Sequence, residues 1–289
     1  MLDVSLIRAD GSKVTASRVL EAINLVTAEM TEITAAGNYL LTGSRNTTLT
    51  INGTGINLTL DGATINVSSG NAINITSGNP TIYVSGNNSI VSNYINNNAS
   101  GIYVATGSSL TISGNNMEED VLRVTAATDG AAIGGYSTGS DQHTNCGDIT
   151  ISNVTVYAET CGNYMNSFAP GIGSTGNTCG TITITNAIVH ARSFGDTNNS
   201  APAIGAYESV PEIVITGSEI YAYRGSYGTS YADYIGQGGN SYGYHGGDIQ
   251  CGSGSITNAT IYKGAYNWLY GTSSNEGSVY YDESGNATE

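Results

Sequence analysis

The chain has 289 residues, of which 39 are glycine and only 11% are charged, and 8 basic against 23 acidic side chains give a formal net charge of −15. Phosphate backbones and anionic membranes attract clustered lysine and arginine, so this charge argues against a nucleic-acid or membrane partner. No apolar stretch approaches the roughly 18 residues of a membrane-spanning helix.

The first 33 residues differ in pattern from the rest of the chain. Apolar residues recur there at alternating intervals of three and four: Ala16, Val19, Ile23, Val26, Met30 and Ile33. This is the spacing of a coiled-coil seam, so residues 1–33 are predicted to form a short strand–helix element. The helix would either cap the following domain or join chains, for example into a homotrimer. Residues 1–8, MLDVSLIR, lack the basic and then apolar pattern of a secretory leader.

From residue 34 onward, apolar positions repeat at intervals of roughly 30 residues, a spacing typical of stacked repeats. Two such columns are Ile73, Ile102, Ile133, Ile172, Ile204, Ile235 and Ile82, Leu110, Ile149, Ile182, Ile213, Gly254. Around each position apolar and small polar residues alternate, which predicts strands with one buried face. We therefore expect an all-β solenoid of about six to seven coils over residues 34–270, followed by a C-terminal tail at 271–289.

A third column contains only glycine and asparagine: Gly86, Gly114, Asn153, Asn186, Gly217 and Asn258. Both residue types tolerate a positive φ angle. We therefore expect a left-handed bend at this corner in every coil.

Several segments resemble a known family. They are ITAAGNYLLTG at 33–43, LTLDGATI at 58–65, GAAIG at 130–134 with CGDITI at 146–151, and APGIG at 169–173 with CGTITI at 179–184. They resemble carbohydrate-binding surface proteins of gut and clostridial bacteria, which share the pectate-lyase-like right-handed parallel β-helix with phage tailspikes and head fibres. The resemblance covers residues 33–265 and implies a single-stranded right-handed parallel β-helix.

Aromatic residues form the best candidate site. In the strand register, Tyr157, His190, Tyr221 and Tyr262 share one outward column, and Glu159, Arg192 and Tyr223 share a second column two residues further on. Aromatic rings stack on sugars and their polar tips bond hydroxyl groups, so we predict glycan stacking by Tyr157, His190, Tyr221, Tyr262, Tyr223 and Arg192. Alternatively, the column only stabilises the sheet. The tyrosine-rich insert after Arg224 is either a binding loop or a packed one.

Cysteines and carboxylates give weaker signals. Cys146 and Cys179 would lie on neighbouring coils, close enough for a disulfide, but Val210 in the same column favours buried thiols. Glu118, Glu119 and Asp120 share a turn and are predicted to be solvated, and no outward carboxylates pair for catalysis. No CxxC or HExxH motif occurs, so we expect no catalytic residue, no metal and no cofactor.

Together these features predict a non-enzymatic virion-surface protein, a head fibre or a tail receptor-binding protein, that contacts glycans of a host surface or of mucus. Residues 1–33 would attach to a capsid or tail, or trimerise. The alternatives are an extracellular cell-surface carbohydrate-binding module or adhesin of a bacterium, and a polysaccharide lyase or glycosidase.

Overall fold

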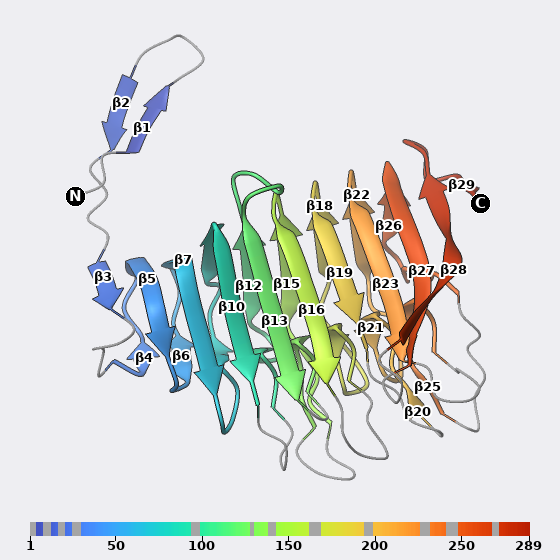
Figure 1. The fold of residues 1–289 in the computed structure, drawn as a ribbon, viewed down its shortest axis with the longest axis horizontal. Coiled ribbons are helices and arrows are strands. Elements are labelled where there is room, and N and C mark those ends of the chain that lie inside the picture. Colours follow the sequence, from blue (N-terminus) through green and yellow to red (C-terminus); the bar gives the residue numbers. More distant parts are fainter. Residues whose placement is uncertain are drawn as a thin grey trace.

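The computed structural model is all-β. It describes residues 4–7, 13–16, 21–24, 30–93, 99–127, 130–137, 143–161, 169–193, 199–225, 232–240, 248–267 and 272–289. Within these ranges every regular element is a strand and none is a helix. From β3 onward the strands lie side by side along the long axis of the molecule, broadly in chain order, as Figure 1 shows.

One sheet, the first ladder, consists of eight short parallel strands, one from each repeat. They are β4 (Glu32–Ile33), β6 (Leu49–Asn52), β8 (Ile73–Ser77), β11 (Ile102–Val104), β14 (Ile133–Gly134), β17 (Ile172–Ser174), β21 (Ile204–Ala206) and β24 (Ile235–Gln237). The predicted column from Ile73 to Ile235 is confirmed, because each of its isoleucines pairs with the next across this ladder.

A second sheet of 17 strands contains two more parallel ladders. The second ladder is β9 (Thr81–Ser85), β12 (Ser109–Ser113), β15 (Asp148–Ser152), β18 (Ile182–Thr185), β22 (Ile213–Thr216) and β26 (Ser255–Thr257). The third ladder is β10 (Asn87–Ser92), β13 (Val121–Ala127), β16 (Thr155–Cys161), β19 (Ile188–Arg192), β23 (Glu219–Gly225) and β27 (Ala259–Asn267). Two long strands, β5 (Gly37–Arg45) and β7 (Ile56–Val67), precede both ladders, and β7 pairs with β9 and with β10.

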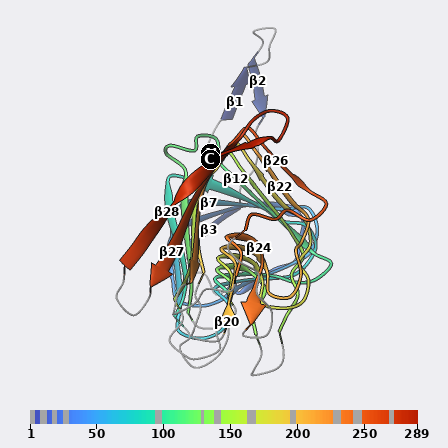
Figure 2. The ribbon, with the colours of Figure 1, turned by 90° about the vertical axis from the view of Figure 1, so that its right-hand side faces the viewer.

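Antiparallel pairs complete the fold. At the C-terminal end β28 (Thr272–Tyr281) pairs with β27, and β29 (Ala287–Thr288) pairs with β28. Part of the predicted C-terminal tail is therefore strand, and it covers the last parallel strand of the third ladder (Figure 2). The other two pairs are β1 (Val4–Ile7) with β2 (Lys13–Ala16), and β20 (Asn199–Ser200) with β25 (Gly239–Asn240).

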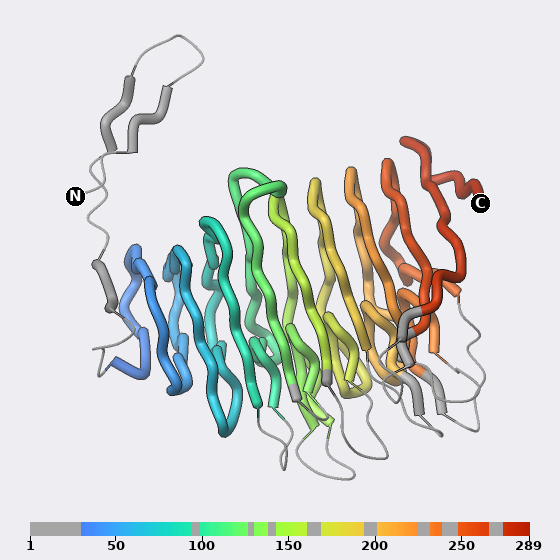
Figure 3. The backbone as a smooth tube through the Cα atoms, viewed as in Figure 1, coloured from blue at the N-terminus to red at the C-terminus, as the bar shows by residue number. Residues whose placement is uncertain are grey.

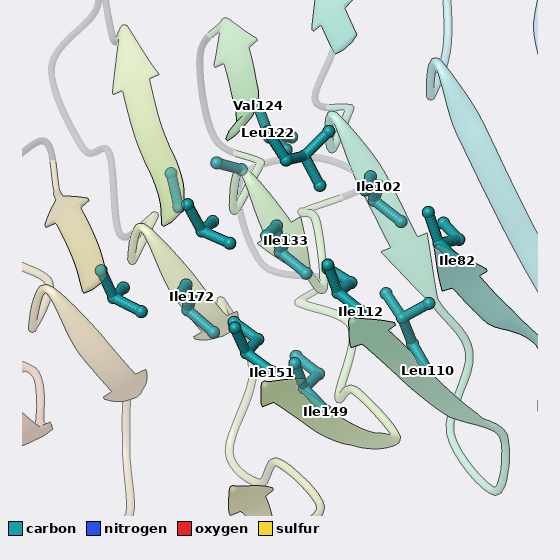
Figure 4. Packing of buried hydrophobic residues seen from close by; sticks show 14 of the residues in the cluster. Ile82, Ile102, Leu110, Ile112, Leu122, Val124, Ile133, Ile149, Ile151 and Ile172 are labelled. Carbon is teal, nitrogen blue, oxygen red and sulfur yellow. The ribbon is translucent and has the colours of Figure 1, made fainter. Parts of the chain in front are cut away.

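The core is a continuous cluster of aliphatic side chains between the ladders. Ile102, Ile133 and Ile172 come from the first ladder, and they face Leu110 and Ile149 from the second (Figure 4). All five are buried. In the second ladder alternation places every second residue inside, whereas β14, β17 and β21 of the first ladder are buried at every position. The tube in Figure 3 shows that successive repeats follow nearly the same path.

The predicted N-terminal helix is wrong. Three residues of the three–four pattern lie in strands: Ala16 ends β2, Ile23 lies in β3 (Glu21–Asn24), and Ile33 ends β4. Val19 and Val26 lie outside the described residues, and Met30 lies in no helix. Strand β3 pairs with β5, and β4 pairs with β6. The first repeat would otherwise expose an unpaired strand edge, and pairing with these residues outweighs the weak helical spacing.

The second predicted column is correct from Leu110 to Gly254 but shifted at its start. Ile82 pairs with Ile112, two residues beyond Leu110. Leu110 and Ile112 are both buried. A shift of two residues keeps the same side chains inside, so hydrophobic alternation alone does not distinguish these registers.

The Gly/Asn corner is confirmed at five of its six positions. Gly86, Asn153, Asn186, Gly217 and Asn258 have φ between 47° and 63°. Gly114 is the exception, because its repeat makes the corner with a longer turn ending at Asp120. The Asp120 carboxylate accepts hydrogen bonds from the backbone N–H groups of Gly86, Asn115 and Asn116. Asp120 is therefore buried, and the prediction that it is solvated is wrong.

Cys146 and Cys179 form a disulfide with a Cα–Cα distance of 4.7 Å. The predicted buried thiols are wrong for this pair, because in-register residues of neighbouring repeats place their Cβ atoms within disulfide reach. The bridge closes a loop with a sequence separation of 33. The chain-entropy model gives such a loop a stabilisation of about 4 kcal/mol. Cys251, two repeats further on, is a half-buried free thiol.

Candidate functional site

The predicted aromatic column is present on the third ladder. Tyr157, His190, Tyr221 and Tyr262 pair in direct register across β16, β19, β23 and β27. Their chain neighbours Val156, Val189, Ile220 and Ile261 are buried. Alternation therefore turns the four rings to the outer face of the sheet.

The four rings of this column, named here the aromatic column, form one continuous stack. Centroid distances are 4.3 Å for Tyr157–His190, 4.3 Å for His190–Tyr221 and 4.5 Å for Tyr221–Tyr262, with interplanar angles of 6°, 8° and 12°. Because each inner ring is covered on both faces, no sugar can stack on those faces. The column instead offers ring edges and polar atoms, which repeat once per strand.

Arg123 extends the column by one residue, which sequence reasoning missed. It pairs in register with Tyr157, and its guanidinium carbon lies 3.9 Å from the centroid of the Tyr157 ring. The signal was present in the sequence, because Arg123 stands between Leu122 and Val124 as Tyr157 stands between Val156 and Ala158. Arg123 is not aromatic, so the aromatic pattern of the column does not include it.

The second predicted column lies beside the first. Glu159 and Arg192 form an ion pair at 3.6 Å with both side chains about one-third exposed. Arg192 is in register with Tyr223, so the second column is also continuous. The structure thus brings all six predicted site residues together on one face of neighbouring strands.

Glu159 and Glu219, two carboxylates on this face, each interact with a neighbouring side chain. The Tyr221 hydroxyl donates a hydrogen bond to Glu219 at 3.3 Å, two residues away on the same strand. Burial raises the pKa of Tyr221, and the Glu219 carboxylate raises it further. The phenol therefore stays protonated at neutral pH and keeps its donor.

His190, in the middle of the column, is neutral at physiological pH. Burial lowers its pKa to about 4, and the positive charges of Arg123 and Arg192 contribute to the same shift. Protonation would place a third positive charge within a partly dehydrated stack. His190 therefore serves as a neutral ring and not as an acid–base group at pH 7.

We expect Arg123→Ala to raise the pKa of His190 from about 4 towards its ordinary value of 6.5, because one of the repelling charges is removed. An NMR titration of the imidazole signals, assigned with His190→Gln, measures this. In the wild type the unfolded chain binds the proton first, so stability falls as the pH drops from about 6.5 towards 4. Arg224→Ala, which removes a cation that does not perturb His190, is the control. An unchanged pKa in Arg123→Ala would contradict this electrostatic account.

A separate hollow of 540 Å³ crosses neighbouring repeats near the start of the second ladder. Its wall includes the Cys146–Cys179 disulfide, Gly78, Ser108 and Asp148. Asp148 is the one charged residue of the lining, and its carboxylate accepts a hydrogen bond from the Thr181 backbone N–H at 2.9 Å. None of the lining residues belongs to the aromatic column.

In the part of the chain that the structure describes, no three His, Cys, Asp or Glu side chains gather into a group that could hold a metal ion. The same residues contain no helix long and apolar enough to span a membrane. The insert tyrosines Tyr227, Tyr231, Tyr242 and Tyr244 lie outside the described residues.

Comparison with known proteins gives no match to a protein-family model, to a curated protein or to a solved structure. The case for function therefore depends on the fold and on the geometry of the aromatic column.

Proposed function

We propose that the chain is a single-stranded right-handed parallel β-helix that acts without catalysis, as a glycan-contacting protein of a virion surface. The three parallel ladders support the fold. From β8 onward each repeat adds one strand to each ladder in the same order, around a single core. This is the arrangement expected when one chain winds repeatedly about an axis.

The observation that carries the binding proposal is the unbroken outward stack from Arg123 to Tyr262. Mutual stacking holds the rings in place, so a ligand does not have to immobilise them. Phenol and imidazole edges then form a row of hydrogen-bonding groups along the axis. A polysaccharide, which repeats hydroxyl groups along its own length, is the ligand class that such a row suits.

The state of the outer carboxylates supports binding and not hydrolysis. Glu159 is in an ion pair with Arg192, and Glu219 accepts a hydrogen bond from Tyr221. Acid–base cleavage of a glycosidic bond needs two carboxyl groups that face a common substrate. These two are each occupied by a neighbouring side chain.

The proposed location is a virion surface, as a head fibre or tail receptor-binding protein, with residues 1–33 attaching to a capsid or tail. The Cys146–Cys179 disulfide supports a place outside the reducing cytosol. A homotrimer remains part of the proposal, but not one joined by a helical seam. Ala16, Ile23 and Ile33, which belong to the three–four pattern that suggested a helix, lie in strands. A bacterial cell-surface adhesin would satisfy the disulfide observation equally well.

We expect the double variant Tyr221→Ala/Tyr262→Ala to bind at least tenfold more weakly than the wild-type protein to a glycan that the wild-type protein binds. Each aromatic contact contributes about 1 kcal/mol, and truncation also loosens the remaining rings. Affinity electrophoresis through gels containing host-surface polysaccharides or mucin measures the retention. Tyr83→Ala removes an exposed tyrosine from the second ladder and is the matched control. If the double variant were retained as strongly as the wild-type protein, with an unchanged circular dichroism spectrum, the aromatic column would not be the binding face.

A further inference from the structure

The distribution of positive charge singles out one residue. Of the eight basic residues, five have described side chains: Arg45, Arg123, Arg192, Arg224 and Lys263. Three of these five are bound to carboxylates, at 3.6 Å for Arg192–Glu159, 3.2 Å for Arg224–Glu276 and 3.2 Å for Lys263–Glu289. Each therefore already has a counter-ion within the chain.

Arg45 and Arg123 are the two described cations without an ion pair, and their surroundings differ. Arg45 is buried, and its guanidinium donates to the backbone oxygens of Met30 and Thr48 and to the Thr47 hydroxyl. Arg123 is exposed and lies over the Tyr157 ring. Among the described side chains it is thus the one exposed cation without a carboxylate partner, in a chain with a net charge of −15.

The position of Arg123 leaves its guanidinium accessible from one side. One side faces the Tyr157 ring at 3.9 Å. On the other side, the residues in register with Arg123 along the same column are Ser89 and then Thr64, whose side chains are short. The column therefore steps down from a planar cation to small hydroxyl groups. On this side no ring of the described residues covers the guanidinium, so it is the side on which an anionic group of a sugar would bind.

We propose that Arg123 is an anion subsite at the end of the aromatic column, and that the glycan bound there carries carboxylate groups, as a uronic-acid polysaccharide does. The inference rests on the proposed function and names its ligand class. An arginine fork bonds a carboxylate through two parallel N–H groups, and the ring beneath it holds the fork in orientation.

The charge of the whole chain opposes an anionic ligand and therefore makes a local cation necessary for this assignment. A net charge of −15 repels a polyanion at long range, so binding of one requires a local cation that is not already neutralised. Nucleic acid fits less well, because its affinity comes from several phosphate contacts and one free arginine supplies few. A neutral glycan would make no use of the unpaired charge.

The test measures retention of the full chain by affinity electrophoresis on polygalacturonate, alginate and hyaluronan, each run beside its carboxyl-reduced neutral product. We expect retention on at least one acidic polymer and a loss of at least tenfold after carboxyl reduction. Arg123→Ala should lower retention on the acidic polymer to the level of the reduced one. Arg123→Gln should do the same while it keeps a long polar side chain. Lys263→Ala changes the net charge equally and should have no effect.

The outcomes separate this inference from the proposed function. Equal retention on the acidic and reduced polymers, lost in Tyr221→Ala/Tyr262→Ala, would overturn the anion subsite and leave the glycan-binding column in place. A preference for the acidic polymer that persists in folded Arg123→Ala and Arg123→Gln would overturn the role of Arg123. Retention on none of the six polymers would count against both proposals.

Discussion

Replacing Gly173 by alanine is expected to lower the free energy of unfolding by more than about 4 kcal/mol. Single substitutions seldom cost this much, and those that do disrupt the packed interior. Gly173 belongs to a column of four glycines, each following an isoleucine of the first ladder: Gly134, Gly173, Gly205 and Gly236. Their φ angles lie between 131° and 145°. A Cβ atom at Gly173 would lie 1.7 Å from the backbone oxygen of Gly205. The next repeat would have to move away, and that movement would break the ladder.

Gly62→Ala is the matched control, because its φ is also positive at 62° but nothing lies within 4 Å of the added Cβ. Its expected cost is the left-handed backbone penalty of about 1 kcal/mol. Urea unfolding followed by far-ultraviolet circular dichroism compares the two variants. Similar unfolding midpoints for Gly173→Ala and Gly62→Ala would show that the repeats are not in contact at Gly173.

The strands were predictable because the same constraint acts in every repeat. Ile133, Ile172 and Ile204 each pair with their counterpart in the next repeat, so a column of identical residues in the sequence becomes a column in space. The N-terminal segment has no such repetition. A three–four spacing over Ala16 to Ile33 fits a helix, but the choice depends on the open edge of β5 and β6, which local sequence does not reveal.

The candidate site was predictable in its membership and not in its geometry. Direct register of Tyr157, His190 and Tyr221 follows from strand alignment alone. Whether the rings cover one another or present their faces to solvent depends on side-chain rotamers, which alignment does not specify. Face-to-face stacking at 4.3 Å changes the expected contact from sugar stacking on ring faces to hydrogen bonding at ring edges.

Asp120 shows how a single residue outside any motif can organise a turn. One carboxylate oxygen accepts the Gly86 N–H at 3.0 Å, and the other accepts the N–H groups of Asn115 and Asn116 at 2.7 Å and 2.9 Å. The side chain thereby joins the turn of one repeat to the corner of the repeat before it. Adjacent Glu118 and Glu119 are exposed. Sequence alone gave no reason to separate Asp120 from them.

We expect Asp120→Asn to lower the free energy of unfolding by about 2–3 kcal/mol at pH 6, because an amide NH₂ group faces N–H donors that the carboxylate accepted. Burial alone would raise the pKa of Asp120, but the hydrogen bonds from Asn116, Asn115 and Gly86 outweigh it and leave the pKa below 3.8. The stabilisation is therefore complete above the unfolded pKa of about 3.9 and is lost as the pH falls through the lower folded value. The difference in the free energy of unfolding between the wild-type protein and Asp120→Asn should therefore become smaller as the pH falls from 5 to 2.

Urea unfolding of both proteins at a series of pH values measures this narrowing, with Glu119→Gln as the control that removes a neighbouring exposed carboxylate. Because Glu119 lies in the same turn, both variants change the net charge of the turn equally. A general electrostatic effect would thus appear in both, whereas loss of the specific hydrogen bonds appears only in Asp120→Asn. A deficit in Asp120→Asn no larger than that in Glu119→Gln, or one that does not change with pH, would mean that the carboxylate does not hold the two repeats together.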